Sequence, residues 1–479
     1  MKRSNIKWIV LLLLIVAAGT LLTLSVMDMF ESGRTAALVN LMNSDVSIFL
    51  IIIVVAIPVL LLALLFVLFF WKDKPNTIVA NINGSVAQQT ETKEAAEKKE
   101  EKGERFCMLS EIERRKNSYK KASYDKNVSL ERLCNEFRDY AAGRLKLYYD
   151  IEDIRRFIAG MAVSHILILQ GMSGTGKTSL AHAFGSFIDN SSTIIPVQPM
   201  WKERTDLVGY YNEFTKKFNE TLLLEKMYEA NYSEDMYITV LDEMNIARVE
   251  YYLAEFLSLL ELPNPDERYL DVVSDKWEND PKQLKDGRIK LPPNMWFIGT
   301  ANNDDSTFAI SDKVYDRAMI LNLDSKSERY IAPKTGKMHI SFAQFTKLVE
   351  EAIEEYEISQ RNKKRLEELD KYLIDHFHIT FGNRIMKQIR TYIPVYISCG
   401  GDELDALDDI LAKKVIRKLE TQNPIYYRNA AEGLVAYINE LFGNDKMMLC
   451  KEYIRRLERN RSEERRVGKE CRSRWSPYH

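Results

Sequence analysis

The pattern of apolar and polar positions divides the chain of 479 residues into four stretches. Two almost wholly apolar runs, 6–27 and 46–71, come first, and a segment dominated by Glu, Lys and Ala follows at 91–104. Short apolar runs then alternate with amphipathic segments, and the last stretch shows helical periodicity alone. About 20 apolar residues suffice to cross a bilayer. The pattern therefore predicts two transmembrane helices before a soluble part.

The charges beside the apolar runs predict their orientation. Basic residues stand at the outer ends of both runs, whereas the connection between the runs is mainly acidic: Lys2, Arg3, Lys7, Lys72 and Lys74 against Asp28, Glu31 and Asp45. Lys and Arg accumulate in cytoplasmic loops. We therefore expect both termini and the soluble part to lie in the cytoplasm, with Trp8 and Trp71 as anchors at the cytoplasmic edges of the spans.

Between residues 165 and 323, short apolar runs alternate with predicted helices. The runs are 165–170, 193–197, 236–241, 295–300 and 318–323. This alternation is typical of a parallel sheet with helices on both faces. From residue 341 onward, apolar residues recur at helical spacing and predict a helical bundle. The expected fold class is thus α/β with a C-terminal helical domain, preceded by two transmembrane helices.

The same pattern predicts the domain boundaries. We expect two spans with a short outer loop over 1–75, a charged linker over 76–126, an α/β domain with a helical lead-in over 127–324, a helical domain over 325–461, and a non-native or disordered tail over 462–479. The net charge of −2 implies no global field that attracts polyanions. The five scattered cysteines form no CxxC pair, which suits a reducing compartment and argues against a zinc site.

A glycine-rich stretch between the first run and a predicted helix carries the strongest chemical signal. Gly171-Met172-Ser173-Gly174-Thr175-Gly176-Lys177-Thr178 has the pattern G-x-x-x-x-G-K-[ST], in which glycines let successive backbone N–H groups surround phosphates. Lys177 would contact the β and γ phosphates, and Thr178 would offer its hydroxyl to Mg²⁺. The residues expected to bind the nucleotide are Gly171, Ser173, Gly174, Thr175, Gly176, Lys177, Thr178 and Ser179.

Two further apolar runs end in polar residues that suit hydrolysis. Asp242 and Glu243 follow the run 236–241, and Asn302 follows the run 295–300. Beside a phosphate loop, a pair of carboxylates holds Mg²⁺ and activates water. We expect Asp242 to hold Mg²⁺, through water, and Glu243 to orient and deprotonate the attacking water. Asn302 would position the same water.

Taken in order, these motifs resemble the AAA+ superfamily. The stretches 206–209, 241–248 and 297–302 resemble its McrB-like branch, and the resemblance covers about 150–323 well and the helical part more loosely. It implies a ring, commonly hexameric, that is driven by ATP or GTP bound between neighbouring subunits. The helical domain then corresponds to the AAA+ lid.

The resemblance also implies roles for three residues. Asn302 falls at the sensor-1 position, and Arg384 falls at the sensor-2 position of the lid, where it would approach the γ-phosphate. Arg317 would reach the neighbouring subunit's γ-phosphate, with Arg248 as a less favoured candidate. In the alternative interpretation, Arg317 forms a local ion pair and Arg384 lies on a helix face.

The chain also departs from the McrB-like pattern. Membrane spans replace a DNA-reading domain, no nuclease constellation is visible, and Met319-Ile320-Leu321 stand where the family carries an arginine pair. The leading hypothesis is therefore a membrane-anchored, Mg²⁺-dependent ATPase that remodels an unidentified protein partner at the cytoplasmic membrane face. A GTP- or ATP-driven nucleic-acid translocase or restriction motor is one alternative. A nucleotide-gated scaffold or sensor is the other.

Overall fold

The computed structural model describes residues 104–116, 123–302, 307–324, 327–421 and 424–459. All of these residues belong to one compact unit, 97–479. Within the described ranges, no helix combines the length and apolarity that crossing a membrane requires. The two predicted spans, the first part of the predicted linker and the tail 462–479 lie outside the described residues.

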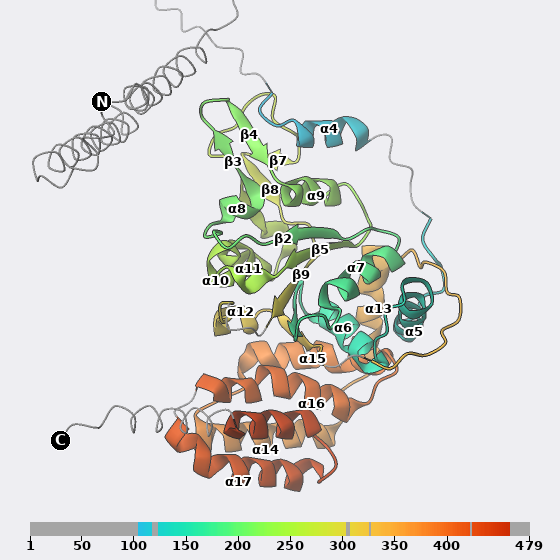
Figure 1. Cartoon of the computed structure of the whole chain (residues 1–479), viewed down its shortest axis with the longest axis vertical. Helices are drawn as coiled ribbons and strands as arrows, with labels where there is room; N and C mark the ends of the chain where they lie inside the picture. The colour runs from blue at the N-terminus through green and yellow to red at the C-terminus, as the bar shows by residue number, and fades with distance from the viewer. Residues whose placement is uncertain (1–103, 117–122, 303–306, 325–326, 422–423, 460–479) are drawn as a thin grey trace, which may run out of the picture. The chain divides into compact units, whose positions relative to one another are not determined.

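The α/β part contains a central sheet, two small sheets and short helices (Figure 1). Its elements are α4 (Met108–Arg115), α5 (Leu130–Tyr140), η2 (Ala141–Leu145), α6 (Ile151–Val163), β1 (Ile166–Gly171), α7 (Lys177–Phe187), β2 (Thr193–Pro196), α8 (Arg204–Val208), β3 (Gly209–Asn212), β4 (Lys217–Glu220), α9 (Leu222–Ala230), β5 (Tyr237–Asp242), η3 (Met244–Ile246), α10 (Val249–Tyr252), α11 (Ala254–Leu260), η4 (Pro265–Glu267), β6 (Tyr269–Asp271), β7 (Leu284–Lys285), β8 (Arg288–Lys290), β9 (Met295–Asn302), α12 (Asp312–Tyr315) and β10 (Met319–Asn322).

The helical part follows directly. Its elements are α13 (Phe342–Glu355), α14 (Gln360–Phe377), α15 (Gly382–Ser398), α16 (Glu403–Lys414), η5 (Ile416–Thr421), α17 (Pro424–Phe442) and a last helix over 448–459. Polar side chains cap the N-termini of several of these helices. At α13, Ser341 forms a capping box with Gln344 that satisfies backbone N–H groups at the start of the helix. The prediction of a helical bundle after residue 341 is confirmed.

The five predicted strands form one parallel sheet in the order β10-β1-β9-β5-β2. The register sets Gly171 of β1 beside Asn302 of β9, and Leu167 of β1 beside Met319 of β10. All strands therefore begin at one edge of the sheet and end at the other. The glycine-rich loop, Asp242 and Asn302 lie at the carboxyl edge, whereas the residue pair Ser164 and Arg317 lies at the amino edge.

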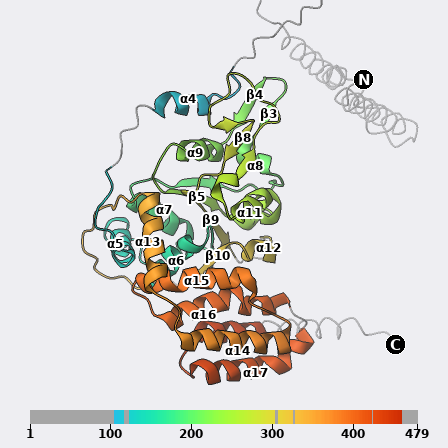
Figure 2. The same ribbon diagram turned by 180° about the vertical axis from the view of Figure 1, so that it is seen from behind.

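Alternate strand residues face two separate cores, as the period of two of a β-strand requires. Leu167 and Leu169 point into the core that α5, α6, α7 and the helical part share. Ile166 and Ile168 point into the core formed by α9, α10 and α11. Figure 2 shows the sheet between these two groups of helices. The sheet is thus buried on both faces, which explains why its strands read as continuous apolar runs.

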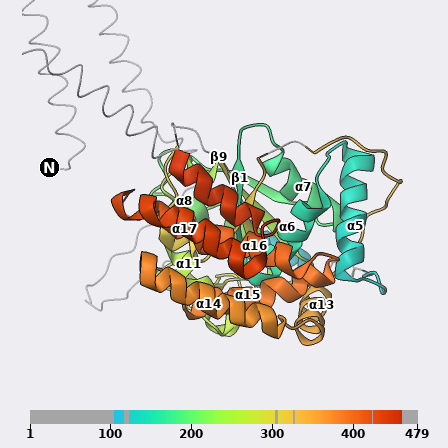
Figure 3. The ribbon, with the colours of Figure 1, turned by 90° about the horizontal axis from the view of Figure 1, so that it is seen from below.

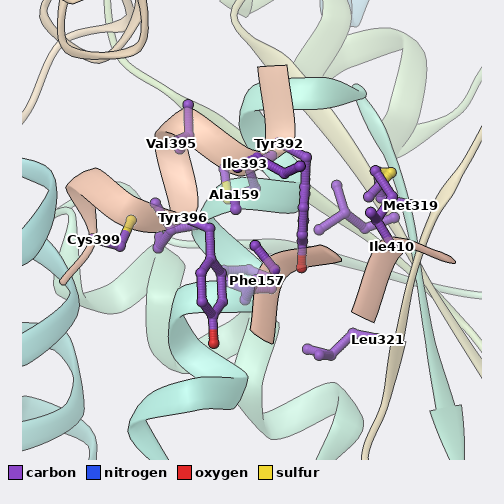
Figure 4. Packing of buried hydrophobic residues seen from close by; sticks show 14 of the residues in the cluster. Phe157, Ala159, Met319, Leu321, Tyr392, Ile393, Val395, Tyr396, Cys399 and Ile410 are labelled. Atoms are coloured by element: carbon purple, nitrogen blue, oxygen red, sulfur yellow. The ribbon is translucent and has the colours of Figure 1, made fainter. Parts of the chain in front are cut away.

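The helical part from α13 onward, called the lid below, packs on only one of these cores. Tyr392, Ile393 and Ile410 of α15 and α16 lie against Phe157 of α6 and Met319 of β10 (Figure 4). Seen from below, α14, α15, α16 and α17 lie side by side (Figure 3). The lid is therefore joined to the sheet through α6 and β10.

The predicted linker over 76–126 is wrong for residues 104–116, which belong to the folded unit. Phe106 and Leu109 are fully buried, and the carboxylate of Glu220 accepts the backbone N–H groups of residues 107–109 at the start of α4. Arg105 is 2% exposed and pairs with Asp275 and Asp280. The abundance of charged residues in this stretch concealed the few apolar residues that anchor it.

Two small sheets extend from the core that faces α9. The strands β3 and β4 form an antiparallel hairpin between α8 and α9, and β6, β8 and β7 form a three-stranded sheet. Arg105 connects the two, since its guanidinium lies over Trp277 of one region and Tyr211 of the other. The chain that enters from residue 104 is therefore fixed to both small sheets.

Candidate nucleotide site

The glycine-rich loop joins β1 to α7 and uses backbone conformations that favour glycine. Gly171, Gly174 and Gly176 have φ values of +146°, +79° and +90°. A Cβ atom at Gly171 would lie 2.2 Å from the carbonyl oxygen of Leu323, so no other residue fits there. The hydroxyl of Tyr149 donates to the carbonyl of Gly176 at 3.0 Å. The loop thus has a fixed shape, with the first N–H groups of α7 directed at the space where phosphates bind in such loops.

Lys177 begins α7 and is folded back over the loop. Its side chain is 7% exposed, and Nζ donates to the carbonyl oxygens of Gly171 and Met172 at 3.0 and 2.7 Å. The loop therefore holds a positive charge among backbone donors. That combination is complementary to a polyphosphate.

Asp242, the last residue of β5, forms hydrogen bonds to α7 and β9. Its Oδ1 accepts hydrogen bonds from Thr178 Oγ1 of α7 at 2.7 Å and from Thr300 Oγ1 of β9 at 2.9 Å. Thr300 Oγ1 in turn accepts the backbone N–H of Glu243 at 2.9 Å. Thr300 is absent from the predicted site residues. Because β9 lies between β1 and β5 in the sheet, the strand order could have identified it.

Glu243 adopts a backbone conformation that non-glycine residues rarely use. Its φ and ψ are +52° and +47°, and its side chain is exposed beyond the end of β5. Met244, the next residue, packs directly on β9, where a Cβ at Gly299 would lie 2.0 Å from Met244 Sδ. This packing turns the chain sharply after Asp242. Strained residues of this kind cluster at functional sites.

Asn302 lies at the carboxyl end of β9, beside Gly171. Its backbone is held by Asn245, whose Oδ1 accepts the N–H of Asn302 at 3.3 Å and whose Nδ2 donates to its carbonyl at 2.8 Å. Asn245 is also missing from the predicted site. Because Asn245 follows Glu243 by only two residues, its hydrogen bonds fix the end of β9 relative to Glu243.

The residues present fit a magnesium ion bound together with a nucleotide. The Thr178 hydroxyl and the Asp242 carboxylate are hard oxygen donors, and they already lie within hydrogen-bond distance. Among the described residues, no group of three or more His, Cys, Asp or Glu side chains forms a metal site. Mg²⁺ usually keeps several waters and takes one or two carboxylates plus substrate phosphates. Thr178 and Asp242 match that requirement.

Arg317 lies at the opposite edge of the sheet. It stands two residues before Met319, which pairs with Leu167 near the start of β1, so the length of β1 separates it from the glycine-rich loop. Six strand residues span roughly 20 Å. Its guanidinium donates to the carboxylate of Glu261 at 2.6 Å and to the carbonyl of Lys313 at 2.8 Å. Arg317 therefore cannot contact phosphates held by its own loop.

Arg384 lies beside Arg317 rather than beside the glycine-rich loop. It pairs with Oε1 of Glu261, while Arg317 pairs with Oε2 of the same carboxylate. The expectation that Arg384 approaches the γ-phosphate of its own subunit therefore does not match its position in this structure. The physical reason is that α15 packs in the core with α6 and β10, which leaves its first turn at the amino edge, where Arg384 meets Glu261.

Two lid arginines that the sequence did not single out lie closer to the strand ends. A cavity of about 740 Å³ lies between the carboxyl ends of β1, β9 and β10 and the lid, and its lining includes Asn302, Arg417 and Arg456. The loop residues 171–178 do not line this cavity, but Gln170 does. Arg417 is 7% exposed and pairs with Asp312 at 2.8 Å. Isolated arginines in amphipathic helices carry no motif, so only the fold could reveal them.

Comparison with known families agrees with this architecture. Residues 166–318 match the family described as AAA domain (dynein-related subfamily), and residues 332–465 match a domain of unknown function (DUF8727). The chain thus contains an AAA+ nucleotide-binding domain followed by a helical domain.

Comparison with individual proteins adds little. No curated protein matches the chain. Among solved structures, a full-length MCM homologue from Methanopyrus kandleri is similar at 9% identity with a TM-score of 0.31, over 61% of this chain and 56% of that chain. The chain therefore spans just over half the length of that protein, and the similarity is too weak to bear on function.

Proposed function

We propose that the chain is a membrane-anchored, Mg²⁺-dependent ATPase of the AAA+ superfamily that remodels a protein partner at the cytoplasmic membrane face. The observation that carries the nucleotide part is the convergence of Thr178, Thr300 and Asp242 beside the glycine-rich loop. A nucleoside triphosphate would occupy the loop, and Mg²⁺ would neutralise part of its charge. GTP is the alternative substrate. The McrB-like resemblance of three stretches supports this branch of the superfamily.

Each residue at the carboxyl edge has a distinct task in this proposal. Lys177 and the N–H groups of the loop bind the phosphates. Thr178 and Asp242 hold the metal, and Thr300 keeps Asp242 in place. Glu243 accepts a proton from the attacking water, and Asn302 orients that water. General-base catalysis of this type contributes about 10²- to 10⁴-fold to a rate.

The position of Arg317 supports a ring, because this residue is too far from its own loop to act there. In a head-to-tail ring, the amino edge of one subunit meets the carboxyl edge of the next, and Arg317 would complete the neighbouring site. Rings of AAA+ proteins are commonly hexameric. Arginine suits this role because its planar fork of donors stays charged.

The β3–β4 hairpin supports a polypeptide partner. Phe214 at its tip is 95% exposed, on a turn whose N–H groups at Phe214 and Thr215 donate to Asn212 Oδ1. An exposed aromatic ring on an ordered turn offers a large apolar contact area. Of the neighbouring charged residues, Glu213 and Lys216 pair with each other at 3.2 Å, and Lys217 is exposed beside them. A nucleic-acid surface would carry a larger cluster of basic residues than these two lysines.

A trapping experiment tests the function. The Glu243→Gln protein is expected to bind ATP, to hydrolyse it at a rate lower by about 10²- to 10⁴-fold, and to retain its partner during purification from membranes. Adding Phe214→Ala to this variant should reduce the captured protein, whereas Ile331→Ala, which alters an equally exposed apolar residue, should not. Capture of nucleic acid instead of protein would favour the translocase, and undiminished ATP hydrolysis would contradict the assignment of Glu243.

Cysteine labelling tests the membrane topology. Cys107 is exposed in the folded unit, and Ser32→Cys would place a thiol in the short connection between the spans. In a Cys471→Ser background, an impermeant maleimide added to intact cells should label position 32 and should reach Cys107 only after permeabilisation. Labelling of Cys107 in intact cells would overturn the proposed orientation.

A further inference from the structure

The backbone around Arg317 is held from three directions. Ser164 Oγ, at the start of β1, donates to the carbonyl of Arg317 at 2.8 Å. Gln388 of α15 donates to the carbonyl of Asp316 at 3.2 Å. The third contact comes from Lys414, the last residue of α16, whose Nζ donates to the carbonyls of Tyr315 at 2.7 Å, of Asp316 at 3.5 Å and of Ala318. The carbonyls on both sides of Arg317 thus share one lid ammonium group.

The burial of Lys414 is unusual for a lysine. Its side chain is 2% exposed, and within the described part of the chain no carboxylate lies at ion-pair distance from Nζ. Burial lowers the pKa of Lys414 to about 7, with Arg417, Lys418 and Arg384 adding to the decrease and Asp316 opposing it. An apolar residue would avoid this cost of desolvation. In its protonated form, the lysine offers three N–H donors, which match the three carbonyl acceptors.

Further lid contacts hold the segment 312–317 to the same lid surface. Arg417 pairs with Asp312 at 2.8 Å, and its guanidinium lies 4.0 Å from the centre of the Tyr315 ring. Glu261 joins Arg384 of the lid to Arg317 itself. Because α15 and α16 also pack on β10, these contacts make the segment part of the lid surface (Figure 4).

We propose that Lys414 is a positioning residue for Arg317, through which the lid of one subunit sets where Arg317 stands toward the nucleotide of the next. This inference rests on the proposed action of Arg317 at the neighbouring site. Among the described residues, the hydrogen bonds of Lys414 Nζ go to the backbone on both sides of Arg317. A movement of the lid would therefore move the arginine. Hydrolysis in the next subunit would follow the state of this subunit's lid.

Substitutions at Lys414 test the inference in full-length rings. Lys414→Met keeps the length of the side chain and removes all three donors, whereas Lys414→Gln keeps a donor group. We expect Lys414→Met to bind ATP with unchanged affinity but to hydrolyse it about ten- to a hundredfold more slowly, the range that misplacing a catalytic group produces. Lys414→Gln should lie between this variant and the wild type. Lys387→Met, an exposed lysine of α15, is the control and should keep full activity.

Mixing and combining variants separate a positioning role from loss of folding. Rings of Lys414→Met and Glu243→Gln subunits contain interfaces with an intact Glu243 on one side and a correctly held Arg317 on the other. Such mixed rings should recover part of the activity. The double variant Arg317→Ala/Lys414→Met should be no slower than Arg317→Ala alone, because both changes remove the same contribution.

The outcomes distinguish this inference from the proposal on which it rests. If Arg317→Ala hydrolyses ATP normally, the proposed trans role of Arg317 is overturned. The inference about Lys414 is then overturned as well, because it rests on that role. If Arg317→Ala is inactive while Lys414→Met is fully active, only the inference about Lys414 is overturned. If Lys414→Met is slow but co-assembles with Glu243→Gln without any recovery, Lys414 acts within its own subunit, and the inference is again overturned.

Discussion

The two ends of β1 are built in different ways. At the carboxyl end, Lys177 returns to carbonyls of the glycine-rich loop only five and six positions away, and the loop's further contacts, with Tyr149 and Leu323, also come from the α/β part. At the amino end, Ser164 contacts Arg317, whose backbone also depends on Lys414, about a hundred residues further on. The first arrangement is built by contacts within the α/β part. The second depends on the lid, so it can change when the lid moves.

This contrast suggests a division of tasks between the two ends. A site that must bind phosphates in every subunit needs donors that do not depend on distant contacts, because preorganised donors need no rearrangement when charge develops. The position of a group that acts on the neighbouring subunit can instead depend on the state of the lid. In this chain, the segment that ends at Arg317 is held by Lys414, Arg417 and Glu261, which come from three different parts of the fold.

The largest effect is expected from a substitution of Arg317, at the amino end of β1. Arg317→Ala should bind ATP nearly normally and lose hydrolysis by about 10³- to 10⁵-fold, the range for arginines that stabilise transferring phosphates. The physical reason is that no other donor replaces the guanidinium as negative charge develops. Nucleotide binding and single-turnover hydrolysis measured on the same preparation would separate the two effects.

A mixing assay decides where Arg317 acts. Arg317→Ala and Glu243→Gln subunits should each be inactive alone and should recover activity when they share a ring. Without recovery in rings shown to contain both subunits, Arg317 would return to the role of a local partner of Glu261. The trans contact would then have to be sought at Arg248, which lies over Tyr251 and Phe308.

The second largest effect is expected from a substitution of Lys177, at the carboxyl end of β1. Lys177→Ala should weaken ATP binding by about ten- to a hundredfold, since a hydrogen bond to a charged group contributes roughly 1.5–3 kcal/mol. Equilibrium binding of a fluorescent nucleotide to the purified protein measures this loss. Membrane insertion should not change, because the spans are distant in sequence.

The matched control for this experiment is Lys347→Ala, which removes a lysine with a 74% exposed side chain on α13. Equal affinities for the wild type and Lys177→Ala would remove Lys177 from the phosphate site. An equal loss in both variants would point to a general effect of net charge rather than to a specific contact.

The same contrast explains what the sequence could predict. The strands, the loop and Asp242 depend on neighbouring residues, and their patterns identified them. The positions of Arg384, Lys414 and Arg417 depend on how helices meet after folding, and no pattern indicates them. Arg384 was expected near the γ-phosphate, but Glu261 holds it at the other edge of the sheet.

Charge composition misled at one further place. Residues 104–116 fall in the linker that the charged segment 91–104 predicts, yet Phe106 and Leu109 are completely buried. The apolar residues of this stretch are confined to Phe106, Cys107, Met108, Leu109 and Ile112, a run too short for a sequence pattern to identify as a helix. Their partners, Phe218 and the surrounding small sheets, become visible only in the fold.

The smallest expected effect concerns His165, next to Ser164 at the amino end. Its ring is partly buried against Trp296, and burial, with the nearby charge of Arg268, lowers its pKa to about 4. An unfolded chain would bind the proton near pH 6.5. Between these values the unfolded state holds more protons than the folded state, so the free energy of unfolding decreases as the pH falls from about 6.5 toward 4.

The change to make is His165→Gln, which removes the titrating group and leaves the backbone bond from Phe297 to residue 165 intact. Between pH 7 and pH 5, the wild type should lose on the order of 1 kcal/mol more stability than this variant, measured as the difference in thermal unfolding midpoints. The exposed His376 provides the control, since His376→Gln should follow the wild type. The affinity of His165→Gln for nucleotide at pH 7 should equal that of the wild type, because the carboxyl end of β1 is built without His165. Identical pH dependence in the wild type and His165→Gln would mean that the folded protein accepts this proton as readily as the unfolded chain, and a weaker affinity would mean that the two ends of β1 are not independent.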